Sequence, residues 1–167
     1  VGHSARDTFS MLQTRQIPMR AKPFAVGVRM EHPQEMINIS QYGTDYPSFL
    51  PSAAYKVTRQ TGAGRGVYSF CMCPGGYVVN ASSEKGHLAV NGMSYHARDS
   101  RNANSAMIVT VTPEDFGSDD ILAGVEFQRK LERAAYELGG GKVPVQLFGD
   151  FCQNIPTTTL GEVEPCI

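Results

Sequence analysis

The sequence predicts an α+β protein, with a largely antiparallel or barrel-like sheet and two helices at about residues 4–16 and 119–138. Three observations lead to this class. Segments of alternating or β-branched residues follow one another between residues 24 and 112. Turns rich in glycine and proline separate several of these segments. The two helical patterns precede and follow this β region, and such segregation favours α+β over a parallel βαβ winding.

The first helix is predicted from its start, its apolar spacing and its end. Ser4 with Asp7 three residues later resembles a capping box, in which side chains satisfy free backbone N–H groups. Phe9 and Leu12 recur at helical spacing, and Pro18 follows the end of the segment. We therefore expect a short helix that packs on one face.

The second helix has the clearer pattern. Asp119–Asp120 stands at the end where the helix dipole is positive, and apolar residues form a stripe between residues 122 and 138. Glu126 and Lys130 have the spacing of a favourable i,i+4 ion pair. The run Gly139–Gly141 ends the helix, because glycine readily adopts the left-handed conformation that often closes one.

The central region contains six predicted strands. Period-two alternation marks the first strand, and β-branched residues mark the last. Residues 33–51 show no clear period and are predicted as loop with at most one helical turn, whereas Val143–Phe148 is predicted as an edge strand because Pro144 cannot donate to a ladder. The six strands are Phe24–Glu31, Tyr55–Thr58, Val67–Cys73, Tyr77–Ala81, Leu88–Asn91 and Ala106–Thr112.

Composition predicts one compact domain over residues 1–167 and excludes several partners. Of these residues 41% are hydrophobic and 19% are charged. Fifteen basic against 16 acidic residues give a net charge of −1, so we expect no nucleic acid or anionic membrane partner. No apolar run approaches the roughly 18 residues of a membrane span, and the start is no signal peptide, so a cytoplasmic location is expected. The initial Val1 and the ending at Glu164–Ile167 suggest a piece excised from a longer chain.

Two glycine-rich runs resemble nucleotide-binding loops in composition but lack the spacing and the neighbouring helix that such loops require. Gly62–Gly66 has the wrong final spacing for G-x-G-x-x-G and leads into a strand, whereas a dinucleotide loop opens a helix. Gly139–Lys142 ends a helix and lacks the Ser or Thr of a P-loop. The sequence therefore shows no nucleotide-binding half of its own.

Cys71 and Cys73 are the most unusual local feature. In a regular strand both thiols lie on one face, with Cα atoms roughly 6.5 to 7 Å apart, at the limit for a disulfide. A zinc site would need two further ligands, and the other cysteines and the scattered histidines lack metal-motif spacing. We predict no metal site. Buried structural cysteines and a redox or cofactor-facing pair are the main alternatives, with metal binding the third.

The turn that follows, Cys73–Gly76, is a candidate binding element. Proline fixes φ at its first position and glycine supplies the positive φ that a tight turn requires. Because Gly75 and Gly76 carry no Cβ, a flat or anionic group can approach their backbone closely. The alternative is a tight hairpin turn and nothing more.

A polar stretch between Asn91 and Ser105, expected to be a loop, supplies the second set of candidates. Its donors suit an anionic or amide-bearing ligand, unless it is simply a solvated loop. His96 lies within it and has the chemistry of an acid or base, so His96 and Cys73 are the weak candidates for a catalytic role. The donors singled out are Arg98, Arg101, Asn102 and Asn104.

Several segments together carry a resemblance to a known family. They are Gly2–Asp7, Lys22–Gln34, Val67–Asn80, Asn91–Ser94 and Arg101–Ser105. The chain resembles a group of bacterial FAD-dependent dehydrogenases, also described as NAD-utilising or NAD(P)/FAD-dependent oxidoreductases, over nearly its whole length. In that family an insert domain interrupts a Rossmann-type FAD domain, and the segment Gly-His-Ser-Ala-Arg-Asp follows the last FAD-domain strand before the insert. This chain is similar to the insert.

The resemblance implies FAD in the full-length parent, with NAD(P)H as a candidate reductant and no cofactor bound by this fragment alone. It implies a domain that caps the flavin, packs on the Rossmann domain of the same chain and forms part of the pocket for a small-molecule substrate, so that the isolated domain is inactive. The alternative is a non-catalytic module that binds a partner or shields the flavin without redox work. The residues expected to face flavin or substrate are Cys71, Cys73, Gly75, Gly76, Arg98, Arg101, Asn102 and Asn104.

Overall fold

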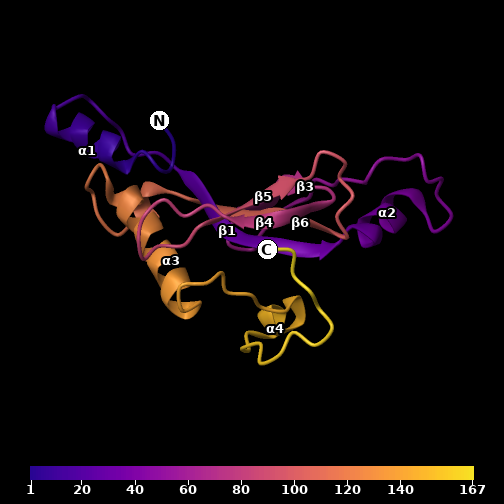
Figure 1. Ribbon diagram of the computed structural model, residues 1–167. Helices are drawn as coiled ribbons and strands as arrows, with labels where there is room; N and C mark the ends of the chain where they lie inside the picture. Colours follow the sequence, from indigo (N-terminus) through magenta and orange to yellow (C-terminus); the bar gives the residue numbers. More distant parts are fainter.

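The fold is α+β, as predicted, and its sheets are open and antiparallel. The computed structural model describes residues 1–167. A four-stranded sheet and a separate two-stranded sheet lie at the centre of the molecule (Figure 1). Neither sheet closes into a barrel, because the outer strands pair on one side only. In spatial order the larger sheet contains β1 (Phe24–Pro33), β6 (Asn102–Val111), β3 (Gly66–Cys73) and β2 (Thr58–Gln60), and the smaller contains β4 (Gly76–Asn80) and β5 (Val90–Ser94).

Each predicted strand overlaps an observed one, but the predicted Tyr55–Thr58 shares only Thr58 with β2, and β6 begins four residues earlier than expected. Its first part, Asn102–Ser105, pairs with the end of β1, so that Asn104 lies opposite Glu31. Residues 91–94 likewise belong to β5. The expectation of one polar loop from Asn91 to Ser105 is therefore wrong, because backbone pairing with β1 and β4 recruits both of its ends into strands.

A β-bulge interrupts β3 at its end. The register with β6 shifts between Phe70 and Cys73, and Cys71 has φ of +45°. The expectation that both thiols share one face is wrong, since the bulge breaks the period of two. Cys71 is exposed and Cys73 is buried.

The two predicted helices are α1 (Arg6–Thr14) and α3 (Ala123–Leu138). The capping box expected at Ser4 does not form, because Ala5 occupies the N-cap and the Asp7 carboxylate accepts a hydrogen bond from the next residue's backbone N–H. Glu126 forms its ion pair with Arg129, one turn away at 2.6 Å, instead of with Lys130. No helix of the structure combines the length and the apolar character that crossing a membrane requires.

Two further helices, α2 (Gln34–Tyr42) and α4 (Phe148–Gln153), were not predicted from the sequence. In α2 the buried residue is the polar Gln34, so an apolar stripe does not reveal the helix. The predicted edge strand Val143–Phe148 is wrong. Its residues pair with no strand, and the backbone N–H of Leu147 instead donates to the Thr157 hydroxyl at 2.9 Å just before α4 begins.

The chain exposes far more surface than a compact protein of its size. Its accessible surface is 11293 Å², whereas the usual scaling for a monomer of 18.2 kDa gives about 8,100 Å². Only 15 of 167 residues are buried, and several of these are polar or small. The helices lie around the ends and one edge of the sheet (Figure 1). The molecule is therefore more open than the compact domain that composition led us to expect.

Candidate functional site

Polar side chains from several strands meet beside the β3 bulge. Arg29 of β1 donates a hydrogen bond from Nη1 to Oδ1 of Asn104 at 2.7 Å, and its guanidinium also lies 3.4 Å from the backbone oxygen of Cys71 and 3.5 Å from Oδ1 of Asn91. These contacts join β1, β3, β5 and β6. We call Arg29, Asn91 and Asn104, with the Cys71 carbonyl, the Arg29 cluster.

The guanidinium of Arg29 has no carboxylate partner. Among arginines that are not classed as exposed, Arg6 and Arg129 both form ion pairs with glutamates, whereas Arg29 forms none. Withdrawing a charge from water is costly unless an opposite charge or good hydrogen bonds replace the water. The Arg29 cluster therefore carries an uncompensated positive charge.

Asn104 is fully buried, and half of its amide has no partner. Its Oδ1 accepts from Arg29, which fixes the orientation of the amide, while Nδ2 has no hydrogen-bond acceptor. Gly92 packs directly on this contact: a Cβ there would overlap both Asn104 Oδ1 and Arg29 Nη1. The absence of a side chain at Gly92 thus makes room for the cluster.

The turn at Gly75 and Gly76 is buried inside the domain. A Cβ at Gly75 would overlap the carbonyl of Arg98, and a Cβ at Gly76 would overlap that of Met93. The Gly75 N–H donates to Gln34 Oε1 at 2.8 Å. The close backbone approach that both glycines permit is therefore made by this chain itself, which accounts for them as elements of a packed turn. Their contact with a cofactor remains a prediction.

The four polar candidates between residues 98 and 104 do not form one group. Arg101 forms an ion pair with Glu164, and Asn102 donates to Glu31 Oε1 at 2.6 Å and to the Glu164 backbone oxygen at 3.3 Å, so both fasten the C-terminal segment to the sheet. The side chain of Arg98 is exposed, with no ion pair. Of the four, only Asn104 enters the Arg29 cluster.

Neither catalytic candidate lies against a second reactive group. His96 is exposed, and Cys73 is buried with its thiol 3.3 Å from the backbone oxygen of Cys71. All four cysteines are free thiols, and no group of three potential metal ligands comes together. Catalytic roles for His96 and Cys73 remain predictions.

Arg29 is the site residue that sequence analysis missed. A signal was available, since Arg29 stands between Val28 and Met30 in a strand whose residues from Phe24 to Val28 carry no charge. A single charged residue in a strand is most simply explained by solvent exposure, and only the fold brings it to Asn104, which is 75 positions away.

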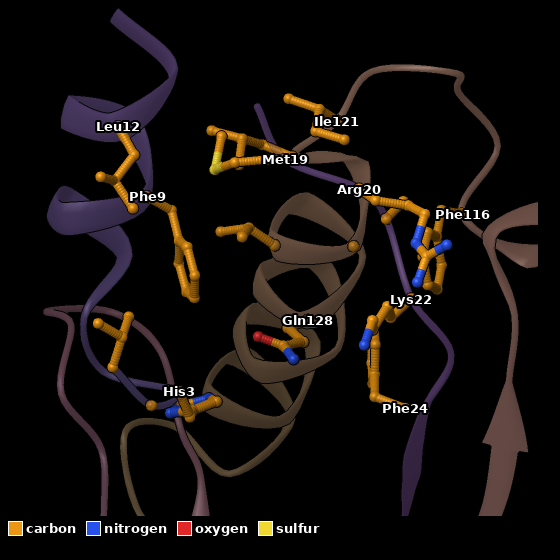
Figure 2. A pocket seen from close by; sticks show the side chains of 16 residues that line it. His3, Phe9, Leu12, Met19, Arg20, Lys22, Phe24, Phe116, Ile121 and Gln128 are labelled. Atoms are coloured by element: carbon orange, nitrogen blue, oxygen red, sulfur yellow. The ribbon is translucent and has the colours of Figure 1, made fainter. Parts of the chain in front are cut away.

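A second candidate region is an apolar pocket of about 590 Å³ between α1, α3 and the segment before β1 (Figure 2). Phe9 and Leu12 of α1 face Met19 and Ile121 across it (Figure 2). The basic residues Arg20 and Lys22 stand on one side. The pocket lies near the start of β1, whereas Arg29 lies five residues further along that strand, about 17 Å away at the usual rise.

A charged network holds α1 beside α3. Arg6, only 3% exposed, contacts Glu132 at 2.7 Å and Glu84 at 3.1 Å, and Arg129 binds Glu84 at 2.8 Å. Hydrogen bonding from Arg129 lowers the pKa of Glu84 to about 2. Burial raises the pKa of Glu132, but hydrogen bonds from Arg6 and His3 outweigh burial and lower it. Both glutamates are therefore charged at neutral pH.

Comparison with known proteins adds two findings. Residues 23–167 match the protein family described as FAD-dependent protein, C-terminal domain-like. An uncharacterized protein of Clostridium beijerinckii (strain ATCC 51743 / NCIMB 8052) is 58% identical over 170 residues, which cover 99% of this chain and 32% of the relative. The chain thus spans about a third of the length of the relative that it matches.

Proposed function

Because the chain belongs to the family described as FAD-dependent protein, C-terminal domain-like, we propose that it is the domain that covers the flavin in a larger FAD-dependent oxidoreductase. In this proposal it is an insert that packs on the Rossmann-type FAD domain of the same polypeptide and contributes one wall of a small-molecule pocket. NAD(P)H is the candidate reductant. The isolated domain has no activity and no measurable affinity for FAD.

The observation that carries the proposal is the surplus of exposed surface. The chain exposes about 3,000 Å² more than a compact monomer of its mass. Large apolar side chains contribute to this surface, among them Phe70 at 55% and Val28 at 47% exposed. Extended apolar surface of this kind marks interaction sites, and a polypeptide about three times as long, like that of the relative, has room for the adjoining domain that we propose as the partner.

The apolar pocket between α1 and α3 is a suitable place for the adjoining domain to dock. It is lined by side chains of Phe9, Leu12 and Met19, and it includes the first three residues of the chain (Figure 2). A segment of the adjoining domain that enters it would bury its own apolar surface together with that of the pocket. The rest of the polypeptide is therefore the occupant that we propose.

The residues of the Arg29 cluster fit one edge of a flavin ring. The pyrimidine edge of the ring carries oxygen and nitrogen acceptors, and the positive charge of Arg29, whose guanidinium is held by Asn104, would attract this edge. Flavin supplies reversible hydride and electron transfer when it is bound. The contribution of this chain is to orient the ring edge, place positive charge beside it and exclude water.

The alternative is a domain that shields the flavin or binds a partner without taking part in redox work. Its support is that Cys73, Gly75 and Gly76 are occupied by contacts within the domain. A shield would change the access of solvent and oxygen to the flavin but not its reduction potential. This difference separates the two functions.

The test uses the full-length flavoprotein with Asn104→Leu, which keeps the approximate volume and removes the amide. The proposal predicts a shifted flavin absorption band and a changed reduction potential, while reoxidation by oxygen is the property that a pure shield would alter. Arg59→Ala is the control, because Arg59 is exposed on β2 and forms no ion pair. Unchanged spectra, potential and reduction rate in a folded Asn104→Leu protein would refute the proposed function.

A further inference from the structure

The guanidinium of Arg29 presents an unused pair of donors. Its Nη1 is occupied by Asn104 at 2.7 Å, whereas Nη2 has only the 3.5 Å contact with Asn91, at the limit of a hydrogen bond. Nε donates to no acceptor, and it is not among the buried atoms that lack one, so it remains accessible. The edge of the guanidinium formed by Nε and Nη2 is therefore open.

We propose that this open edge of Arg29 binds a carboxylate group of the substrate. Two parallel N–H groups match the two oxygens of a carboxylate, and such paired contacts are the strong, orienting form of this interaction. The inference rests on the proposed function only in taking the carboxylate to belong to the substrate. It adds a chemical class to that substrate.

No carboxylate of this chain forms an ion pair with the guanidinium of Arg29. Glu31 is two residues along β1, on the same face as Arg29. Its Oε1 accepts hydrogen bonds from Asn102 Nδ2 at 2.6 Å and from the Cys166 backbone N–H at 2.7 Å, so it is held toward the C-terminal segment. Arg29 has no ion pair with Glu31 or with any other residue.

The surroundings favour one planar, singly charged group over a phosphate. The oxygens of Cys71 and of the Asn91 amide lie within 3.5 Å of the guanidinium. A carboxylate presents two oxygens in one plane along the free edge, whereas a phosphate projects a further oxygen toward the Asn91 amide oxygen, which contacts Nη2. The Asn91 amide is exposed at the rim, where the remainder of a ligand could pass.

The test is calorimetric titration of the full-length flavoprotein with sodium acetate, and with inorganic phosphate and sodium chloride at matched ionic strength. We expect saturable binding of acetate. Phosphate and chloride should bind at least tenfold more weakly than acetate, or not at all. Arg29→Met should lower the affinity for acetate at least tenfold. Arg29→Lys keeps the charge but lacks the paired donors, so it should also lose most of the affinity. Arg59→Met is the control for a general loss of positive charge.

Each result decides one question. Absence of saturable acetate binding, phosphate binding tighter than acetate, or wild-type affinity in a folded Arg29→Lys protein overturns the carboxylate site. The flavin absorption spectrum, recorded during the same titration, reports separately on the proposed function. Acetate binding that depends on Arg29 but leaves that spectrum unchanged would establish the carboxylate site and count against a location beside the flavin.

Discussion

The buried guanidinium of Arg6 contacts the carboxylate of Glu132 at 2.7 Å and thereby ties the first turn of α1 to the middle of α3. The ion pairs with Glu132 and Glu84 compensate the buried charge of Arg6, whose Nε has no hydrogen-bond acceptor. Few other polar contacts join α1 and α3. We therefore expect their relative position, and with it the apolar pocket between them, to depend on Arg6.

Replacing Arg6 should loosen α1. Arg6→Ala leaves Glu132 without its buried partner, and breaking such a pair costs about 3–5 kcal/mol. Hydrogen–deuterium exchange of the full-length protein should show faster exchange throughout α1. Arg15→Ala, at an exposed position just after the same helix, is the matched control. Equal exchange in the two variants would show that the ion pair does not hold the helix.

The contact between α1 and α3 should weaken in acid. The pKa of Glu84 is about 2 in the folded protein, below its ordinary value of 4.5, because Arg129 donates hydrogen bonds to it. A lowered carboxylate pKa contributes stability that is fully present above pH 4.5 and is lost as the pH falls toward 2. The protection of α3 amides, taken as the intrinsic exchange rate at each pH divided by the observed rate, should fall less steeply with decreasing pH in Glu84→Gln than in the wild type. Glu137→Gln, at an exposed position, should keep the wild-type slope.

Two glycines with positive φ should respond differently to alanine. Gly75→Ala combines a left-handed backbone with overlap of the Arg98 carbonyl, so we expect a loss of at least about 3 kcal/mol in stability. Gly64 has φ of +77° but open space around it, so Gly64→Ala should cost only about 1–2 kcal/mol. Thermal denaturation of the full-length variants measures both. A Gly75→Ala protein as stable as Gly64→Ala would contradict the packed turn.

Burial of Cys73 should slow the reaction of its thiol relative to an exposed thiol of the same chain. Cys73 is 9% exposed, whereas Cys152 is exposed. Alkylation of the full-length protein followed by mass spectrometry should modify Cys73 at least about tenfold more slowly than Cys152, because a buried thiol must await local opening. Cys71 is exposed in this domain, so its protection in the full-length protein would locate an interface on the bulge. Rapid modification of Cys73 would rule out its burial.

The order of the strands along the chain was predictable because alternation and turn chemistry act over a few neighbouring residues. The six strands and the helices α1 and α3 are found close to the expected segments. α2 was missed for an equally local reason: its buried side chain is Gln34, which is held by the backbone carbonyl of Ala53 at 2.9 Å and by Asn38 at 2.8 Å. A helix that buries a polar side chain in this way shows no periodic pattern of apolar residues in its sequence.

The candidate site was predictable only in part. The sequence indicated Asn104 and the cysteine-containing strand, and the fold places both beside Arg29. It also indicated Gly75, Arg101 and Asn102, which the fold commits to contacts within the domain. Nothing local distinguishes an asparagine that binds Glu31 from one that binds Arg29, because both lie on one face of β6 and the register with β1 decides which side chain each of them reaches.

By itself, then, the sequence determined the α+β class, the strands and a resemblance to flavin-dependent proteins, since all three depend on residue identity over short or contiguous stretches. Tertiary structure decided the openness of the fold, the bulge that separates Cys71 from Cys73 and the assembly of the Arg29 cluster. Arg29 meets Asn91 and Asn104 across 62 and 75 positions of sequence, respectively. Strand pairing and its register set such contacts, and the residues that make them carry no local mark of their partners.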